Sequence, residues 1–274
     1  MPELKPLDWP PIEVEVRASE DQLAAMIQRI AKNFEHMGET EPYWSVLSAE
    51  QYRVEHIKEN EAEFYGSGRE PVSMFEATAA RCGVTLGRTM TCFELGCGLG
   101  RSTIWLADIF GRVIGADISR PHLRHAEQTA RRLGKRNIGF LRVDEPDAIA
   151  RAPEFDVFFS IIVLQHNPPP IIYKILHTAL SKLRPGGIAY FQVPTYRQGY
   201  QFRIAEYLGS KNQLGTPEMH VLPQPDLYAL FEEVGCRPLE VREDSASGEG
   251  AIVSNRFLLR KVRAAAKGRL DKLV

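Results

Sequence analysis

Three glycines and an acid have the types and spacing of a ligand-binding site. The segment FELGCGLGR places Gly96, Gly98 and Gly100 between a short apolar run and a predicted helix. Glycine permits a tight turn and lets a ligand approach the backbone, and the helix that follows offers free amide donors and the positive end of its dipole. Asp117 lies 19 residues after Gly98, at the end of the next apolar run. An acid at that place can accept both hydroxyl protons of a ribose, so the pattern predicts a nucleoside site.

The glycine spacing indicates which nucleoside is bound. Folds that bind dinucleotides use GxGxxG, whereas this segment reads GxGxG, with Glu94 two residues before its first glycine. The segment ELGCGLGRS resembles the first motif of class I S-adenosylmethionine-dependent methyltransferases. The likeness extends over roughly residues 85–262, through VIGADIS, RVDEPDA, FDVFFSIIVLQHNPP and LRPGGIAYF.

The resemblance implies that S-adenosylmethionine lies across the carboxyl ends of a parallel sheet. Glu94 and the first two glycines would shape the methionine end, and Asp117 would hold the ribose, with the next residue beside the adenine. Asp144 would read the adenine amino group, and the carbonyl of Ser160 would meet the methionine amino group. Cys97 is interpreted as a small filler of the loop rather than a nucleophile. The cofactor-binding residues implied in this way are Glu94, Gly96, Cys97, Gly98, Gly100, Asp117, Ile118, Asp144 and Ser160.

Two histidines are candidates for a general base on the acceptor side. His166 follows the predicted fourth strand of the sheet, near the expected position of the methyl group, and His220 lies in segment 194–224, where this superfamily commonly covers the acceptor. A histidine titrates near neutral pH and can take a proton from a hydroxyl acceptor. The alternative for each is a structural loop histidine, and the sequence does not choose between the two. Further candidates for contact with the acceptor are Trp44, Tyr65, Tyr196, Arg197 and Tyr200.

The aromatic candidates of the N-terminal region have a second interpretation. Aromatic residues at helical spacing usually belong to a core, which is the default for Tyr65. Trp44 falls between two predicted helices, and loops carry function disproportionately, so closure over a ligand is the alternative. Neither His166 nor His220 is accompanied by a carboxylate cluster or an HxxxH pair, so no metal is predicted.

Two kinds of element must position these residues. Residues 1–84 read as helices, with capping boxes at Ser19 and Ser48 and no strand signal. From residue 90, apolar strands alternate with helices of roughly 10–15 residues, which is typical of crossover units in a parallel sheet. The predicted fold class is α/β: a doubly wound, Rossmann-like sheet of seven strands, the last one antiparallel, with a helical N-terminal extension.

The expected organisation has three parts: a helical extension or lid (1–84), a cofactor-binding domain (85–262) with an acceptor-side insertion (194–224), and a basic tail (263–274). A net charge of −1 gives no support to a nucleic-acid-binding protein. Four scattered cysteines indicate a reduced, cytoplasmic chain, and no apolar run has the length of a transmembrane helix. The basic tail is interpreted as solvated, with contact to an anionic partner as the alternative.

The expected function is transfer of a methyl group from S-adenosylmethionine to a small-molecule or glycan acceptor, at oxygen. One alternative is an NAD(P)-dependent oxidoreductase on a related fold, which the GxGxG spacing disfavours. The other is a non-catalytic module that binds S-adenosylmethionine, which the intact acids at positions 94, 117 and 144 disfavour. The sequence does not indicate the acceptor or the oligomeric state.

Overall fold

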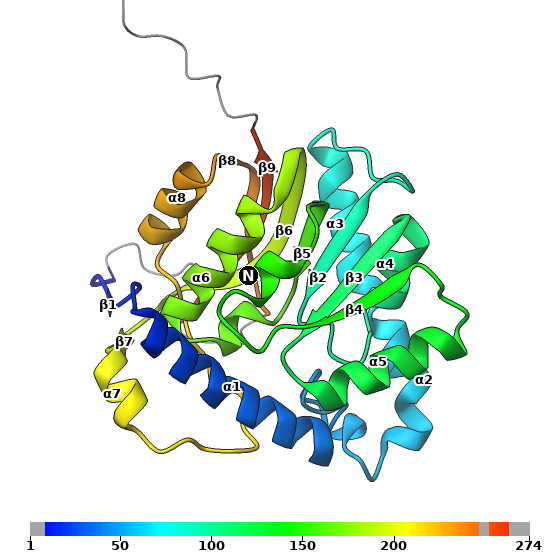
Figure 1. Cartoon of the computed structure of the whole chain (residues 1–274), viewed down its shortest axis with the longest axis horizontal. Helices are drawn as coiled ribbons and strands as arrows, with labels where there is room; N and C mark the ends of the chain where they lie inside the picture. Colours follow the sequence, from blue (N-terminus) through cyan, green and yellow to red (C-terminus); the bar gives the residue numbers. More distant parts are fainter. Residues whose placement is uncertain (1–8, 247–251, 263–274) are drawn as a thin grey trace, which may run out of the picture.

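A seven-stranded sheet forms the centre of the structure, a computed structural model that describes residues 9–246 and 252–262 (Figure 1). Its strand order is β4-β3-β2-β5-β6-β9-β8. Neighbouring strands are parallel except that β9 runs antiparallel to β6 and β8. The strands are β2 (Thr91–Leu95), β3 (Arg112–Asp117), β4 (Ile138–Arg142), β5 (Phe155–Ser160), β6 (Leu183–Arg197), β8 (Cys236–Asp244) and β9 (Ile252–Lys261).

Helices cover both faces of this sheet. Apolar residues of α3 and α4 pack on one face, against alternate residues of β2 such as Cys92, and those of α6 and α8 pack on the other, against Phe93. Because both faces are buried, four of the six residues of β5 are apolar. The predicted doubly wound sheet with an antiparallel last strand is confirmed. The helices are α1 (Glu20–Thr40), α2 (Ile57–Ser67), α3 (Arg69–Arg81), α4 (Thr103–Ile109), α5 (Arg120–Arg132), α6 (Pro169–Ser181), α7 (Ile204–Gly209) and α8 (Gln224–Glu233), with short 3₁₀ turns η1 (Glu50–Tyr52), η2 (Ala148–Arg151) and η3 (Leu164–His166).

Helix α1 crosses the carboxyl-terminal edge of the sheet (Figure 1). It begins with the predicted capping box, in which Ser19 and Gln22 exchange side-chain-to-backbone hydrogen bonds. Its apolar side packs with residues of α6 and α7. The N-terminal region therefore contributes one wall of the space above the strands, although the predicted division of the chain at residue 84 stays a prediction.

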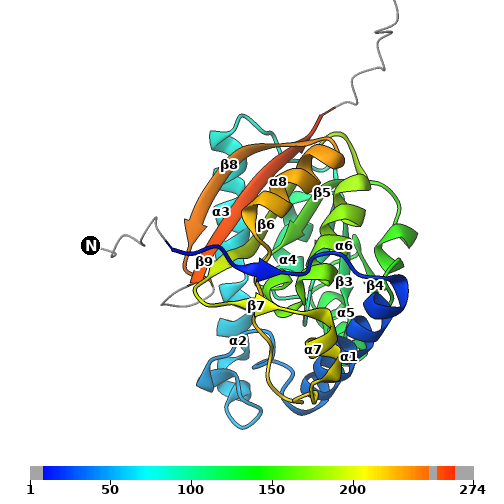
Figure 2. The same ribbon diagram turned by 90° about the vertical axis from the view of Figure 1, so that its left-hand side faces the viewer.

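The structure departs from the sequence expectations at two places before residue 84. Ser48 does not cap a helix, because its hydroxyl donates to the carbonyl of Trp44, and α2 begins only at Ile57. A strand that the sequence did not signal, β1 (Glu13–Val14), pairs in parallel with β7 (Gln201–Phe202), as Figure 2 shows. Two residues are too few for a periodic pattern, so this pairing had no detectable signal. The predicted basic tail, 263–274, lies outside the described residues.

Two neighbouring glycines allow a matched test of how α2 and α3 pack on the sheet. A Cβ atom at Gly68, between the two helices, would overlap the carbonyl oxygen of Arg101, whereas a Cβ atom at Gly66 would meet nothing within 4 Å. We expect Gly68→Ala to lower the free energy of unfolding by about 1–3 kcal/mol through this overlap. Gly66→Ala, inside α2, should raise it by about 0.5–1 kcal/mol. Urea denaturation of both variants measures the difference, and equal effects would contradict the packing described.

Candidate active site

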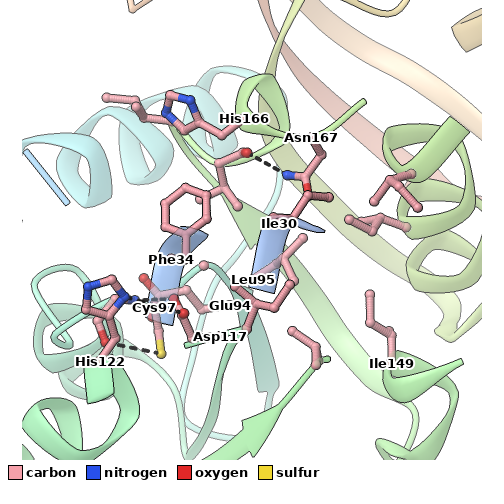
Figure 3. Close-up of a pocket in the computed structure, with 18 of the residues that line it drawn as sticks. Ile30, Phe34, Glu94, Leu95, Cys97, Asp117, His122, Ile149, His166 and Asn167 are labelled. Carbon is pink, nitrogen blue, oxygen red and sulfur yellow. Dashed lines mark hydrogen bonds and ion pairs between the residues drawn. The ribbon is translucent and has the colours of Figure 1, made fainter. Parts of the chain in front are cut away.

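A pocket lies at the carboxyl ends of β2, β3 and β5, beneath α1 (Figure 3). This is where open α/β sheets bind their ligands. It is lined by the glycine loop after β2, by residues that follow β3 and β4, by the loop after β5 and by one side of α1. The predicted site residues that line it are Glu94, Gly96, Cys97, Gly98, Asp117, Ile118 and His166.

The glycine loop has a backbone that other residues rarely adopt. The φ angles of Gly96, Gly98 and Gly100 are +71°, +52° and +85°. A Cβ atom at Gly98 would lie 2.7 Å from a methyl group of Val46, and one at Gly96 would overlap Val163. The glycines are therefore required by the packing of these two valines as well as by the turn itself.

A buried carboxylate fastens this loop to β3. Oδ2 of Asp117 accepts a hydrogen bond from the Gly98 amide and Oδ1 accepts one from the Ser119 amide, each at 2.8 Å. Each carboxylate oxygen has a second lone pair, so Asp117 can still accept from a ligand in the pocket. The hydroxyl of Ser119 caps α5, as the sequence predicted.

A second acid of the pocket has one carboxylate oxygen without a hydrogen bond. Glu94 is 4% exposed, and its Oε2 forms no hydrogen bond within the described part of the chain. Burial raises the pKa of Glu94 to about 7, and the Thr103 hydroxyl and the charge of Arg101 offset only part of this rise. An unpaired buried acceptor carries a large desolvation cost, so Glu94 is suited to a ligand that brings a cation or an N–H donor.

His166 lies at the opposite side of the pocket, in the loop after β5 (Figure 3). Its Nδ1 is 2.8 Å from the carbonyl oxygen of Glu218. A carbonyl can only accept, so Nδ1 carries the proton and Nε2 keeps a lone pair. Within residues 9–246 and 252–262, Nε2 has a single hydrogen-bond contact, a long one of 3.4 Å from the side-chain amide nitrogen of Gln165. Burial lowers the pKa of His166, so the ring is held neutral with an accepting nitrogen beside the pocket.

The other candidate histidine does not line this pocket. His220 is buried among aromatic rings, with Nδ1 2.8 Å from the Tyr200 hydroxyl and Nε2 3.0 Å from Oε2 of Glu218. Both ring nitrogens are therefore engaged by protein groups. His220 and Tyr200 form part of a buried polar cluster behind the pocket wall rather than of the wall itself.

Residues 93–187 match the family model of a methyltransferase domain. This part of the chain is a methyltransferase domain. The match agrees with the GxGxG segment and decides against the nicotinamide-dependent oxidoreductase that was the alternative. The methyltransferase uses S-adenosylmethionine as its cofactor, and the unpartnered Glu94 carboxylate in the pocket fits a ligand with an ammonium group.

Solved structures of similar fold include enzymes of different chemistry. The chain is 16% identical to the magnesium protoporphyrin IX methyltransferase of Synechocystis PCC 6803 with bound SAH, over 86% of this chain and 99% of that one (TM-score 0.59). It is 14% identical to the [4+2]-cyclase SpnF over 92% and 99% of the two chains (TM-score 0.56). It is 16% identical to a putative sarcosine dimethylglycine methyltransferase of Galdieria sulphuraria, over 72% and 85% (TM-score 0.53). These likenesses show the fold, and no curated protein matches the chain significantly.

Several predicted cofactor residues of the methyltransferase are not among those that line the pocket. Gly100 turns the loop into α4, close to Ala126 of α5. Ser160 is fully buried and donates to the carbonyl of Leu95, which ties β5 to the end of β2. Asp144 pairs with Arg142 at 2.8 Å in a neighbouring charged groove, and the next residue, Glu145, lines the pocket. Oδ2 of Asp144 is the oxygen engaged by Arg142, so contact with adenine would use the remaining lone pairs of the carboxylate.

The predicted acceptor residues of the methyltransferase are spread over its surface and core. The Tyr65 hydroxyl bonds to Thr129 in the core, at 2.8 Å. Trp44 lies under the guanidinium of Arg53. Tyr196 stacks on Trp9, and its hydroxyl donates to the carbonyl of Pro10. Arg197 is exposed at the end of β6, so the structure does not bring these four side chains together at the pocket.

The structure adds lining residues that the sequence analysis missed. His122 accepts or donates a 2.8 Å hydrogen bond with the Ser45 hydroxyl through Nε2, and its Nδ1 lies 3.7 Å from Asp117. Ile30 and Phe34 of α1 form the apolar wall above the strands. The helical spacing of residues 23–34 showed that α1 has an apolar face, but it could not show that this face borders the cofactor site rather than a separate core.

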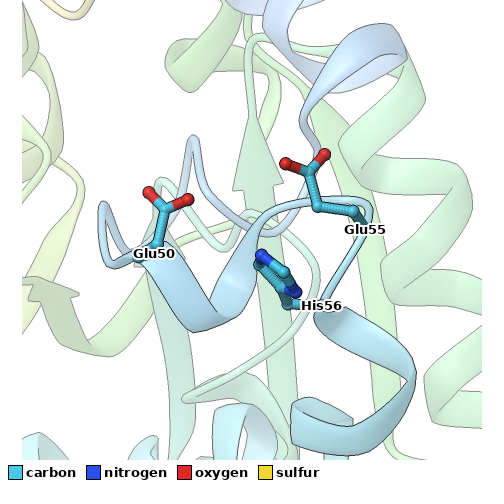
Figure 4. Close-up of side chains that lie close together, drawn as sticks. All are labelled: Glu50, Glu55 and His56. Carbon is cyan, nitrogen blue, oxygen red and sulfur yellow. The ribbon is translucent and has the colours of Figure 1, made fainter.

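A cluster of two acids and a histidine lies away from the pocket. Glu50, Glu55 and His56 bring carboxylate and imidazole atoms within 4.8 Å of one another, but all three side chains are exposed (Figure 4). Exposed acidic groups cluster in this way without a metal, so the expectation of a metal-free enzyme stays a prediction.

Among the described helices, none combines the length and apolarity needed to cross a membrane.

The raised pKa of Glu94 makes a prediction about stability against pH. The pKa of Glu94 is about 7 in the folded enzyme and 4.5 in an unfolded chain, so the folded form keeps its proton to a higher pH. Its burial therefore costs little below about pH 4.5, and the cost grows as the pH rises towards 7 and the carboxylate ionises. The free energy of unfolding of Glu94→Gln minus that of wild type should therefore increase by about 2–3 kcal/mol from pH 5 to pH 8. Urea denaturation at both pH values measures this, and parallel pH profiles would contradict the raised pKa.

Proposed function

We propose that this methyltransferase methylates a hydroxyl oxygen on a small, largely apolar molecule, with His166 as the general base. The observation that carries the proposal is the state of His166: a neutral ring that lines the pocket, with its Nδ1 proton held by the Glu218 carbonyl and Nε2 left to accept. A hydroxyl has a high pKa, so its oxygen reacts faster when a positioned base takes its proton. A carboxylate or amine acceptor would not need such a group.

Chain residues around the glycine loop are proposed to hold the cofactor. Bound S-adenosylmethionine supplies an electrophilic methyl group on a sulfonium. The Glu94 carboxylate binds the ammonium of its methionine part, which would satisfy the unpartnered Oε2. The free lone pairs of Asp117 accept the ribose hydroxyls. Ile118 and the backbone beside it lie against the adenine.

The walls of the pocket favour an apolar acceptor over a glycan. Ile27, Ile30 and Phe34 of α1 face Ile162 and Val163 of the loop after β5 across the pocket. The ring of Phe34 lies 6.2 Å from that of His166, so the group that His166 deprotonates is bordered by hydrocarbon. A sugar would lose water from several hydroxyls there without gaining partners, which is costly. An alcohol or phenol on an apolar framework loses little.

Cofactor binding can be tested at Asp117 with a matched control at the other end of the sheet. Asp117→Asn removes the charge but keeps one oxygen for the loop, and we expect S-adenosylhomocysteine to bind at least about tenfold more weakly, since charge-assisted hydrogen bonds contribute roughly 1.5–3 kcal/mol each. Asp156 also accepts a backbone amide, from Thr91 at 2.8 Å, but at the amino end of β2. Asp156→Asn should leave the affinity unchanged in calorimetry. Equal affinities for the two variants would remove Asp117 from the site.

The base is tested by single-turnover methyl transfer to a panel of apolar alcohols and phenols, with labelled S-adenosylmethionine. We expect His166→Gln to lower the rate about 10²–10⁴-fold at unchanged cofactor affinity, because His166 acts on the acceptor. Amines and sugars of similar size serve as controls in the panel. Two outcomes would show that the proposed acceptor class and base are wrong. One is methyl transfer to an amine at the same rate in wild type and in His166→Gln. The other is a His166→Gln variant that keeps more than about a third of the wild-type rate towards hydroxyl acceptors.

A further inference from the structure

A cluster of charged and phenolic groups lies directly behind His166, outside the pocket. Its centre is the Glu218 carboxylate. Arg29 of α1 lies 3.2 Å from Oε1, and the hydroxyl of Tyr207 and Nε2 of His220 donate to Oε2 at 2.8 and 3.0 Å. Burial alone would raise the pKa of Glu218, but the hydrogen bonds from His220 and Tyr207 outweigh it and lower the pKa. The carboxylate is therefore ionised and bound from three directions.

The same cluster fixes the segment that carries Glu218. Arg29 also donates to the carbonyls of Tyr207 and Ser210 at 2.7 and 3.0 Å, so α1 holds the end of α7. The guanidinium group of Arg29 also stacks on the ring of Tyr207, with its central carbon 4.2 Å from the ring centre. The chain from α7 to residue 218 is thus attached to α1 at both ends, and the attachment at residue 218 is the Glu218 side chain.

Two hydrogen bonds, one from a side chain and one between backbone groups, connect this segment to the loop of His166. Nδ1–H of His166 donates to the Glu218 carbonyl at 2.8 Å, and the amide of His220 donates to the Gln165 carbonyl at 2.7 Å. The two bonds run in opposite directions between neighbouring residues of the two segments. A shift of residues 218–220 would therefore change the partner of the His166 ring.

We propose that Glu218 is a positioning residue: through its bonds to Arg29, Tyr207 and His220, it holds its own carbonyl where it fixes His166 as the Nδ1–H tautomer, with Nε2 left as the accepting nitrogen. The proposal rests on the proposed function of His166. It also gives a role to two features that the function of His166 does not explain. His220 and Tyr200 form a buried hydrogen-bonded chain with no access to the pocket, and α1 carries a partly buried arginine on its polar side. Both serve to hold the Glu218 carboxylate.

The tautomer of His166 is the direct readout, because a merely structural ion pair would not control it. Long-range proton–nitrogen correlation spectra of the histidine-labelled enzyme distinguish the two neutral tautomers, and loss of signals in His166→Gln assigns the ring. We expect wild type at pH 8 to show the Nδ1–H form alone. In Glu218→Ala about a third or more of the molecules should populate the Nε2–H form, because the carbonyl is no longer held. Glu218→Gln keeps the size and the Tyr207 contact and should show a smaller fraction.

The control is Glu240→Gln, which breaks a comparable pair with Arg81, 2.6 Å long, on the far side of the sheet. It should leave the His166 tautomer unchanged, and all variants should bind S-adenosylhomocysteine as wild type does, since Glu218 does not line the pocket. A pure Nδ1–H form in every folded Glu218 variant would overturn the proposal, as would an Nε2–H form in wild type.

The tautomer and the methyl-transfer rate separate the two proposals. If the tautomer follows Glu218 while His166→Gln retains its rate, the proposed base is wrong and the positioning role of Glu218 stands. If the tautomer ignores Glu218 while His166→Gln loses its rate, the base stands and the positioning role is wrong.

Discussion

The buried carboxylate of Asp117 is the interaction on which the cofactor side depends. No lysine or arginine of the described part of the chain forms an ion pair with it. Two backbone amides, of Gly98 and Ser119, do so instead, and hydrogen bonds from N–H groups to a carboxylate are among the stronger ones in proteins. Because these amides belong to the loop after β2 and to the start of α5, one side chain sets the distance between two neighbouring βα units. The imidazole of His122, 3.7 Å away, extends the same arrangement to Ser45.

The acceptor side depends on a backbone that is held in an unusual shape. Ile162 has a φ of +60°, a conformation that a β-branched residue adopts at a cost of order 1–2 kcal/mol. Gln192 of β6 accepts from its amide at 3.1 Å and donates to the side chain of Gln165 at 2.9 Å. The loop between β5 and α6 is therefore held by buried amides on one side and by the Glu218 segment on the other. Strained backbone of this kind is found mainly at ligand sites.

The fold and the cofactor side were predictable from the sequence because both follow local rules. Apolar runs alternating with helical spacing specify a parallel sheet, and the carboxyl ends of parallel strands lie at one edge, which brings Glu94, Asp117 and His166 to one pocket without further information. The glycine spacing added the class of ligand. Each of these inferences uses residues that lie close together in the sequence or the alternation of elements along it.

The rest could not be predicted, because it depends on contacts between segments far apart in the chain. The sequence offered His166 and His220 as equal candidates, and only the path of the insertion shows that one faces the pocket while the other bonds to Glu218. A backbone carbonyl, such as the one that orients His166, is present at every residue and leaves no mark in a sequence. The ion pair between Arg142 and Asp144 likewise could not be foreseen, because side-chain pairs of this kind carry no spacing signal.

The short sheet of β1 and β7 has a consequence for the order in which the molecule assembles. The ion pair between Glu13 and Arg203 joins residues 190 positions apart, and that between Arg29 and Glu218 joins residues 189 apart. Loops of this length close at a large entropic cost unless intervening structure already brings their ends together. We therefore expect residues 201–220, together with β1 and α1, to pack into place after the central sheet. By the same reasoning they are the first part to detach, through openings that leave β2, β3 and the glycine loop folded. Under the proposed function, acceptors would then enter and leave while the glycine loop and Asp117 keep their positions.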